Sequence, residues 1–181
     1  MNMLAALIAV LGVLWTQAAA YHIYTIPSPG RDYVLQTVTI DNTKDTADIH
    51  VRNGLCSSDT IFDYKHGYIA TRVFSQRACF IMKMEKGYTL TLEDIGRLAY
   101  ERQMMTKMYS PTYWWVQYEP ADSIIAEMKE WLLYGDAIEG LCKGVPLYGV
   151  HKVESGINSG GCFKTGILGI LHISVCGKVH V

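Results

Sequence analysis

Alternation of apolar and polar side chains with a period of two runs from residue 34 to residue 84 and restricts the fold more than any other feature. Successive side chains of a β-strand point to opposite faces, so this period indicates strands. Residues 34–40 and 47–51, separated by a polar stretch, predict a β-hairpin. Runs at 60–64, 67–74 and 78–84, separated by turn residues, predict three more strands connected as a meander.

The period changes to 3.6 after residue 90, which indicates a helix. Thr91 followed by Asp94 fits a capping box at its start. A second amphipathic helix is predicted from about Asp122 to Tyr134, with Gly135 as its stop. The expected apolar face of the first helix consists of Leu92, Ile95, Leu98, Ala99, Met105 and Met108.

The remaining segments complete an α+β pattern. Residues 113–118, with two Trp and two Tyr, predict a buried strand. Residues from Asp136 predict a short helical turn that leads to Cys142. A last strand pair is expected between Cys162 and Cys176.

The first twenty residues contain no charged side chain, and an apolar stretch from Met3 to Trp15 precedes three alanines. This pattern predicts a signal peptide, residues 1–20, that is cleaved after Ala20. The alternative is an uncleaved membrane anchor, but this stretch at 1.5 Å per residue falls short of a hydrocarbon core of about 30 Å. We therefore expect a secreted, extracellular protein that passes through the endoplasmic reticulum and Golgi and has no membrane span.

Charge and motifs exclude several classes of function. The formal net charge is -1 and no run of three basic residues occurs, so nucleic acid is not an expected partner. The sequence lacks G-x-S-x-G, H-E-x-x-H, P-loop and dinucleotide-binding motifs. Asp63 and His66 are three residues apart, but on a strand and its turn they are expected to point different ways. We expect no catalytic residue, no metal site and no cofactor.

Five cysteines, none in a C-x-x-C pair, are found at positions 56, 79, 142, 162 and 176. In an oxidising compartment disulfides are the default, and an odd count leaves one cysteine over. One leftover and two pairs allow about fifteen arrangements. The residues alone do not choose among them.

Three segments together resemble the BRICHOS domain of the gastrokine family: Ile61–Ala70 (IFDYKHGYIA), Arg77–Met84 (RACFIMKM) and Leu141–Lys143. The similarity extends over nearly the whole chain. It implies a five-stranded antiparallel sheet with a helix packed on each face, a disulfide from Cys79 to Cys142, and the family's aspartate at Asp63.

The resemblance also divides the chain. Residues 21–53 are expected to form an N-terminal β-hairpin region, 54–148 the BRICHOS domain, and 149–181 a C-terminal β-prone segment. A second disulfide, from Cys162 to Cys176, would staple the C-terminal hairpin and contribute about 3 kcal/mol on the chain-entropy model. These two pairs leave Cys56 for an intermolecular disulfide.

The function that the resemblance implies is non-enzymatic. The family suggests a covalent complex, through Cys56, with a trefoil-factor peptide of gastric mucus, acting in epithelial protection and restraint of cell proliferation. A homodimer or a free thiol at Cys56 are the alternatives for that residue. The other functional hypothesis is an extracellular chaperone that shields β-prone segments from aggregation; a small-molecule carrier fits less well because the chain has two internal helices.

Overall fold

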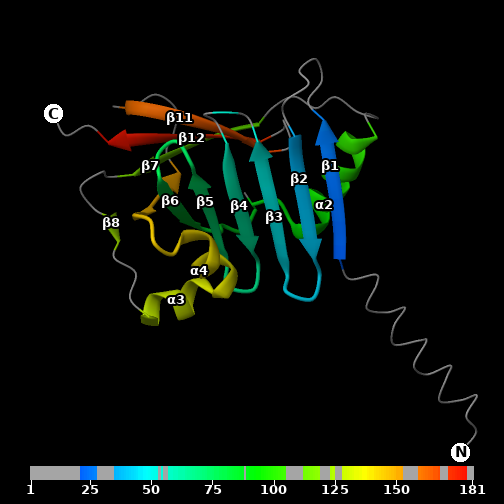
Figure 1. Ribbon diagram of the computed structural model, residues 1–181, viewed down its shortest axis with the longest axis horizontal. Helices are drawn as coiled ribbons and strands as arrows, with labels where there is room; N and C mark the ends of the chain where they lie inside the picture. Colours follow the sequence, from blue (N-terminus) through cyan, green and yellow to red (C-terminus); the bar gives the residue numbers. More distant parts are fainter. Residues whose placement is uncertain are drawn as a thin grey trace, which may run out of the picture.

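The computed structural model describes residues 21–27, 35–52, 54, 57–87, 89–104, 112–118, 123–124, 128–152, 159–167 and 171–178. Over these residues the chain forms two sheets and three helices (Figure 1). The predicted signal peptide, its cleavage point after Ala20, and Cys56 lie outside the described residues. No helix in the described part of the chain is both long enough and apolar enough to cross a membrane.

The larger sheet has eight strands among the described residues. In spatial order they are β1 (Tyr21–Pro27), β2 (Leu35–Asp41), β3 (Thr46–Arg52), β4 (Ser58–Asp63), β5 (Tyr68–Val73), β6 (Ala78–Lys83), β9 (Leu147–Gly149) and β8 (Ser123–Ile124). Neighbours from β1 to β6 are antiparallel, and β9 adds to β6 in parallel. The predicted hairpin forms as β2 and β3, and the predicted meander as β4, β5 and β6.

The expected five-stranded sheet is therefore too small. β1 pairs with β2 from Tyr21 opposite Asp41 to Pro27 opposite Leu35, and β3 pairs with β4. Because these ladders continue without a break, the hairpin region is part of the main sheet and does not flank it. Sequence analysis did not identify β1, which has no apolar-polar alternation as clear as that of β2.

The second sheet has four described strands, in the order β10 (His151–Lys152), β7 (Thr112–Tyr118), β12 (Leu171–Lys178) and β11 (Ser159–Ile167). β7 confirms the strand predicted at 113–118, and β11 with β12 confirms the final strand pair. This sheet lies across one end of the strands of the larger sheet (Figure 1).

The three described helices are α2 (Leu92–Gln103), α3 (Met128–Tyr134) and α4 (Asp136–Cys142). The predicted capping box is present: the Thr91 hydroxyl accepts from the Asp94 amide, and the Asp94 carboxylate accepts from the Thr91 amide. Gly135 ends α3 as predicted, and α4 is the predicted helical turn. The expected positions of Met105 and Met108 fall outside the described residues.

The second predicted helix, Asp122 to Tyr134, is wrong in its first half. Ser123 and Ile124 form β8, which pairs antiparallel with β9 at the edge of the larger sheet. The backbone of these two residues hydrogen-bonds to a neighbouring strand, so it cannot also form the first turn of a helix. Among the described residues of this range, those of Met128–Tyr134 are helical.

Helices cover both faces of the larger sheet, as the resemblance implied. On one face the buried residues Ile95 and Leu98 of α2 share a core with Phe62 and Ile69. On the other face Ile138 of α4 shares a core with the sheet and the buried Cys79–Cys142 pair. Neighbouring residues of β5 go to opposite cores because side chains alternate along a strand. The fold is a mixed α+β structure.

Candidate functional site

Asp63, at which the resemblance implies the family's aspartate, is the last residue of β4 and is only 2% exposed. Its Oδ1 accepts a hydrogen bond from the His66 backbone amide at 2.9 Å, and its Oδ2 lies 2.8 Å from His66 Nδ1. The Gly67 amide donates to the Asp63 carbonyl at 2.8 Å. The carboxylate is therefore buried with partners on both oxygens, and it holds together the turn between β4 and β5.

The expectation that Asp63 and His66 point different ways is wrong. The turn of residues 64–67 reverses the chain within four residues, so the ring of His66 returns over the end of β4. A serine or cysteine nucleophile would be needed to complete a hydrolytic triad, and no described contact of this pair involves one. The arrangement is that of a structural pair.

Gly135 joins α3 to α4 directly above this pair. Its φ of +88° is in the left-handed region that favours glycine. A Cβ atom at this position would lie 2.3 Å from His66 Nδ1 and 2.8 Å from Asp63 Oδ2. The missing side chain allows the helix junction to sit against Asp63 and His66, so the family aspartate supports the start of α4.

The other end of α4 is fastened by the disulfide. Cys142, the last residue of α4, is bonded to Cys79 of β6, and both are fully buried. The two Cα atoms are 5.5 Å apart, within the usual range for a disulfide. This is the pairing that the resemblance implied. It fixes α4 across β4, β5 and β6.

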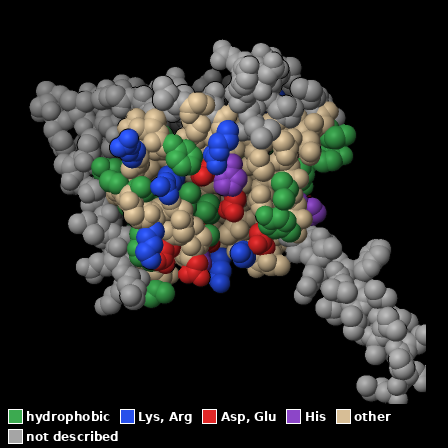
Figure 2. Space-filling model, viewed as in Figure 1, with side chains coloured by type: hydrophobic (Ala, Val, Ile, Leu, Met, Phe, Trp, Pro, Cys, Tyr) green, Lys and Arg blue, Asp and Glu red, His purple; other side chains and the backbone are tan. Residues whose placement is uncertain are grey.

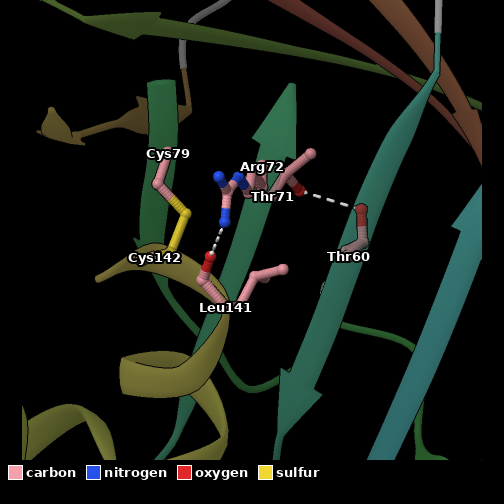
Figure 3. The surroundings of a disulfide bond; sticks show 6 residues. All are labelled: Thr60, Thr71, Arg72, Cys79, Leu141 and Cys142. Atoms are coloured by element: carbon pink, nitrogen blue, oxygen red, sulfur yellow. Dashed lines mark hydrogen bonds between the residues drawn. A yellow bond between two sulfur atoms is a disulfide. The ribbon is translucent and has the colours of Figure 1, made fainter. Parts of the chain in front are cut away.

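Arg72 adds a polar tie beside the disulfide (Figure 3). It lies directly opposite Cys79 in the pairing of β5 with β6, and its Nη1 donates to the Leu141 carbonyl at 2.9 Å. Charged donors make stronger hydrogen bonds than neutral ones. On the opposite face of the sheet the hydroxyls of Thr60 in β4 and Thr71 in β5 are 3.0 Å apart, on the side that α2 covers.

Sequence reasoning did not identify Arg72, and it treated Gly135 only as a helix stop. A signal existed for the first residue, because an arginine in the middle of a strand with buried residues on either side needs a partner. No comparable signal marks the approach of Gly135 to His66, since that contact depends on how two distant segments pack.

Of the other cysteines, Cys162 and Cys176 are placed by the backbone alone, and Cys56 lies outside the described residues. Cys162 and Cys176 lie directly opposite each other on the antiparallel strands β11 and β12. Their side chains lie outside what the structure describes. Cys56 belongs to the connection between Arg52, which ends β3, and Ser58, which begins β4.

Two aspartates of β3 and β4 have pKa values shifted from the ordinary one. Burial raises the pKa of Asp48, and one of its buried carboxylate oxygens has no hydrogen-bond partner. Burial also acts on Asp59, but hydrogen bonds from Arg52 and His50 outweigh it and lower the pKa of that carboxyl. Among the described residues no group of three or more His, Cys, Asp or Glu side chains could hold a metal ion.

α3 exposes apolar side chains to solvent. Leu132 is 75% and Leu133 54% exposed. A hollow of about 280 Å³ beside them is lined by Trp131, Leu132, Asp136, Glu139 and Lys143. Exposed apolar groups next to a hollow are a usual feature of protein-binding surfaces.

Comparisons with known proteins identify the family. The BRICHOS domain model matches residues 54–149. Gastrokine-2 of Rattus norvegicus is 47% identical and gastrokine-2 of Mus musculus 44% identical, each over the full length of both chains. Gastrokine-1 of Homo sapiens is 27% identical over 78% of this chain and 77% of its own length. No solved structure matches.

These similarities extend through both segments that flank the BRICHOS match. The chain belongs to the gastrokine family of BRICHOS-domain proteins.

Proposed function

We propose that this protein is a secreted, non-enzymatic protein of the gastric mucosa that acts as a disulfide-linked complex with a trefoil-factor peptide. In this proposal Cys56 forms the intermolecular bond, and the complex protects the epithelium and restrains cell proliferation. Two thiols lose two electrons and two protons in forming the bond, and a disulfide of the oxidising secretory pathway takes these up by thiol-disulfide exchange and is reduced to two thiols.

The arrangement of the cysteines is the observation that carries the proposal. Cys79 and Cys142 are bonded to each other and buried, so they are not available to a partner. Cys162 and Cys176 lie opposite each other on neighbouring strands. Directly opposite residues of an antiparallel pair have Cβ atoms about 4.5–5.5 Å apart, close to the spacing that a disulfide needs. Pairing them leaves Cys56 as the odd cysteine.

The test is a non-reducing gel of the protein secreted together with a trefoil-factor peptide. We expect a heterodimer band that Cys56→Ser abolishes and that reducing agent converts to monomer. The matched control is the double variant Cys162→Ser and Cys176→Ser, which should keep the heterodimer because it removes a pair and not the odd cysteine. A heterodimer that survives Cys56→Ser would contradict the proposal, as would a wild-type protein that is monomeric before reduction.

A second candidate function is that of an extracellular chaperone, and the exposed apolar surface of α3 favours it. Leu132 and Leu133 would offer a contact for unfolded, β-prone segments of other proteins. If so, sub-stoichiometric protein should delay fibril formation by an unrelated β-prone peptide, and Leu132→Lys should weaken this delay. Unchanged fibril kinetics in the presence of the wild-type protein would exclude this function.

A further inference from the structure

The connection that contains Cys56 leads into β4 beside an exposed aromatic ring. The carbonyl of Ser57, the residue after Cys56, accepts a hydrogen bond from the Phe74 amide at 3.3 Å. Phe74 begins the turn between β5 and β6, and its side chain is 43% exposed. The exposed phenyl ring therefore belongs to Phe74, whose backbone is hydrogen-bonded to Ser57, the residue that follows Cys56 in the sequence.

Two arginines flank this ring. The guanidinium carbon of Arg52 is 5.4 Å from the ring centroid of Phe74, and that of Arg72 is 6.0 Å away. A third arginine, Arg77, ends the same turn; its amide donates to the Phe74 carbonyl at 3.2 Å and its side chain is exposed. We call Arg52, Arg72, Phe74 and Arg77 the basic aromatic patch. Figure 2 shows basic side chains grouped around a hydrophobic one at this end of the larger sheet.

Among the described residues, one carboxylate pairs with the three arginines of the patch. Arg52 pairs with the Asp59 carboxylate, which also lies 2.8 Å from His50 Nδ1. Arg72 donates to the Leu141 carbonyl, which has no formal charge. Three arginines and one aspartate give a local charge of about +2 with His50 neutral, whereas the whole chain has a formal net charge of -1. The patch is thus a local concentration of positive charge on a nearly neutral protein.

We propose that the basic aromatic patch binds an acidic segment of the partner that Cys56 joins. Guanidinium groups bind carboxylates through paired hydrogen bonds, and those of Arg52 and Arg72 lie over the Phe74 ring. The attraction also raises the rate at which the two proteins meet. The interaction is non-covalent and makes or breaks no bond.

This inference rests on the proposed function for the identity of the partner. Binding of an acidic peptide to the patch can be measured whether or not the proposed function is right. In the secreted chain with Cys56→Ser, binding can be measured without any covalent link. The probe is a fluorescein-labelled peptide, Glu-Glu-Ala-Glu-Glu amide, followed by fluorescence anisotropy. A peptide with lysine in place of each glutamate controls for charge, and a short oligonucleotide of equal charge controls for the class of polyanion.

We expect Arg77→Glu to weaken binding of the acidic peptide about tenfold, because one attraction becomes a repulsion. Phe74→Ala should weaken it by about threefold through loss of the ring between the arginines. Lys44→Glu is the matched control: Lys44 is exposed on the turn between β2 and β3, and we expect a change of less than about twofold. Raising the salt concentration to about 0.5 M should weaken wild-type binding.

With Cys56 present, Arg77→Glu should slow formation of the covalent trefoil complex about fivefold without preventing it.

Peptide binding that is equal in wild type and Arg77→Glu, or equally reduced by Lys44→Glu, would overturn the inference. Tighter binding of the oligonucleotide than of the acidic peptide would also overturn it. If the trefoil complex never forms but peptide binding still depends on Arg77, the proposed function is wrong, whereas the binding role of the patch is supported. If the complex forms at the same rate in Arg77→Glu, the inference fails and the proposed function stands.

Discussion

The two faces of the larger sheet are covered in different ways. α2 is a twelve-residue helix with a capping box and a buried stripe of Ile95, Leu98 and Ala99. Opposite it, the chain is helical in two seven-residue pieces, α3 and α4, interrupted at Gly135. A disulfide, a half-buried arginine contact and a close approach to Asp63 hold those two pieces.

The difference shows that a short helix depends more on tertiary contacts for its stability than a long one does. Helices shorter than about 12–15 residues are marginal alone and depend on tertiary contacts. α2 reaches that length and has its own cap, so apolar packing suffices to hold it. α4 has two turns, no side-chain cap and few buried residues, so it depends on specific ties at its two ends. The disulfide and the contact of Gly135 with Asp63 and His66 are both on this face of the sheet.

Removing the disulfide should have the largest effect. For a sequence separation of 63, the chain-entropy model gives a loss of about 4 kcal/mol in the free energy of unfolding for Cys79→Ala with Cys142→Ala. Chemical denaturation measures this loss, and hydrogen exchange should show α4 opening before α2. Cys56→Ser is the control and should change stability little. A loss below about 1 kcal/mol would contradict the role given to the disulfide.

Gly135→Ala should cause the second largest loss in the free energy of unfolding. The new Cβ would overlap His66, and its φ of +88° disfavours alanine, so we expect a loss of about 3 kcal/mol. Gly140→Ala is the matched control within α4, because a Cβ there meets nothing within 4 Å. That control should be neutral or stabilising by up to about 1 kcal/mol. Equal effects of the two substitutions would show that the helix junction does not rest on His66 and Asp63.

Arg72→Met should cost about 2 kcal/mol, because the Leu141 carbonyl loses a charged donor and the ring of Phe74 loses a neighbour. The comparison is Arg97→Met on α2. Arg97 is 53% exposed and pairs with Asp94 at 3.0 Å, so its loss should cost at most about 0.5 kcal/mol. Thermal unfolding of both variants measures the difference, and an equal loss would remove the distinction between the two faces.

The smallest predicted effect concerns pH. The pKa of Asp48 is raised above 3.8 by burial, so the ionised carboxylate opposes folding at neutral pH. That penalty decreases as the pH falls through the raised pKa and is absent below 3.8. Asp48→Asn should therefore stabilise the protein at pH 7 and have no effect at about pH 3. The exposed Glu85→Gln serves as control, and a destabilising Asp48→Asn at pH 7 would contradict the assignment.

The sequence predicted elements whose signal is local. The alternation in β2 to β6, the cap at Thr91 and the stop at Gly135 depend on neighbours in the chain, and the structure reproduces them. The missing parts depend on distant segments. Ser123 and Ile124 have helix-compatible neighbours but pair with β9, and His66 meets Asp63 because of the turn between them.

The sequence likewise indicated some residues of the candidate site and missed others. The family resemblance implied the bonded pair of Cys79 and Cys142 and the position of Asp63. It did not indicate that Gly135 and Arg72 complete the fastening of α4, because those contacts cross between elements. Local sequence patterns thus predicted the strands and the helix cap. How α3 and α4 are held against the sheet depends on tertiary packing.

Disulfide mapping by mass spectrometry of the secreted, unreduced protein tests the central claim most directly. We predict a peptide linking Cys79 to Cys142, a second linking Cys162 to Cys176, and Cys56 joined to a cysteine of another chain. The contradictory result is Cys56 bonded to any of the other four cysteines of the same chain, since Cys56 would then not be the cysteine left for a partner; a bond to Cys79 or Cys142 would in addition remove the disulfide that holds α4.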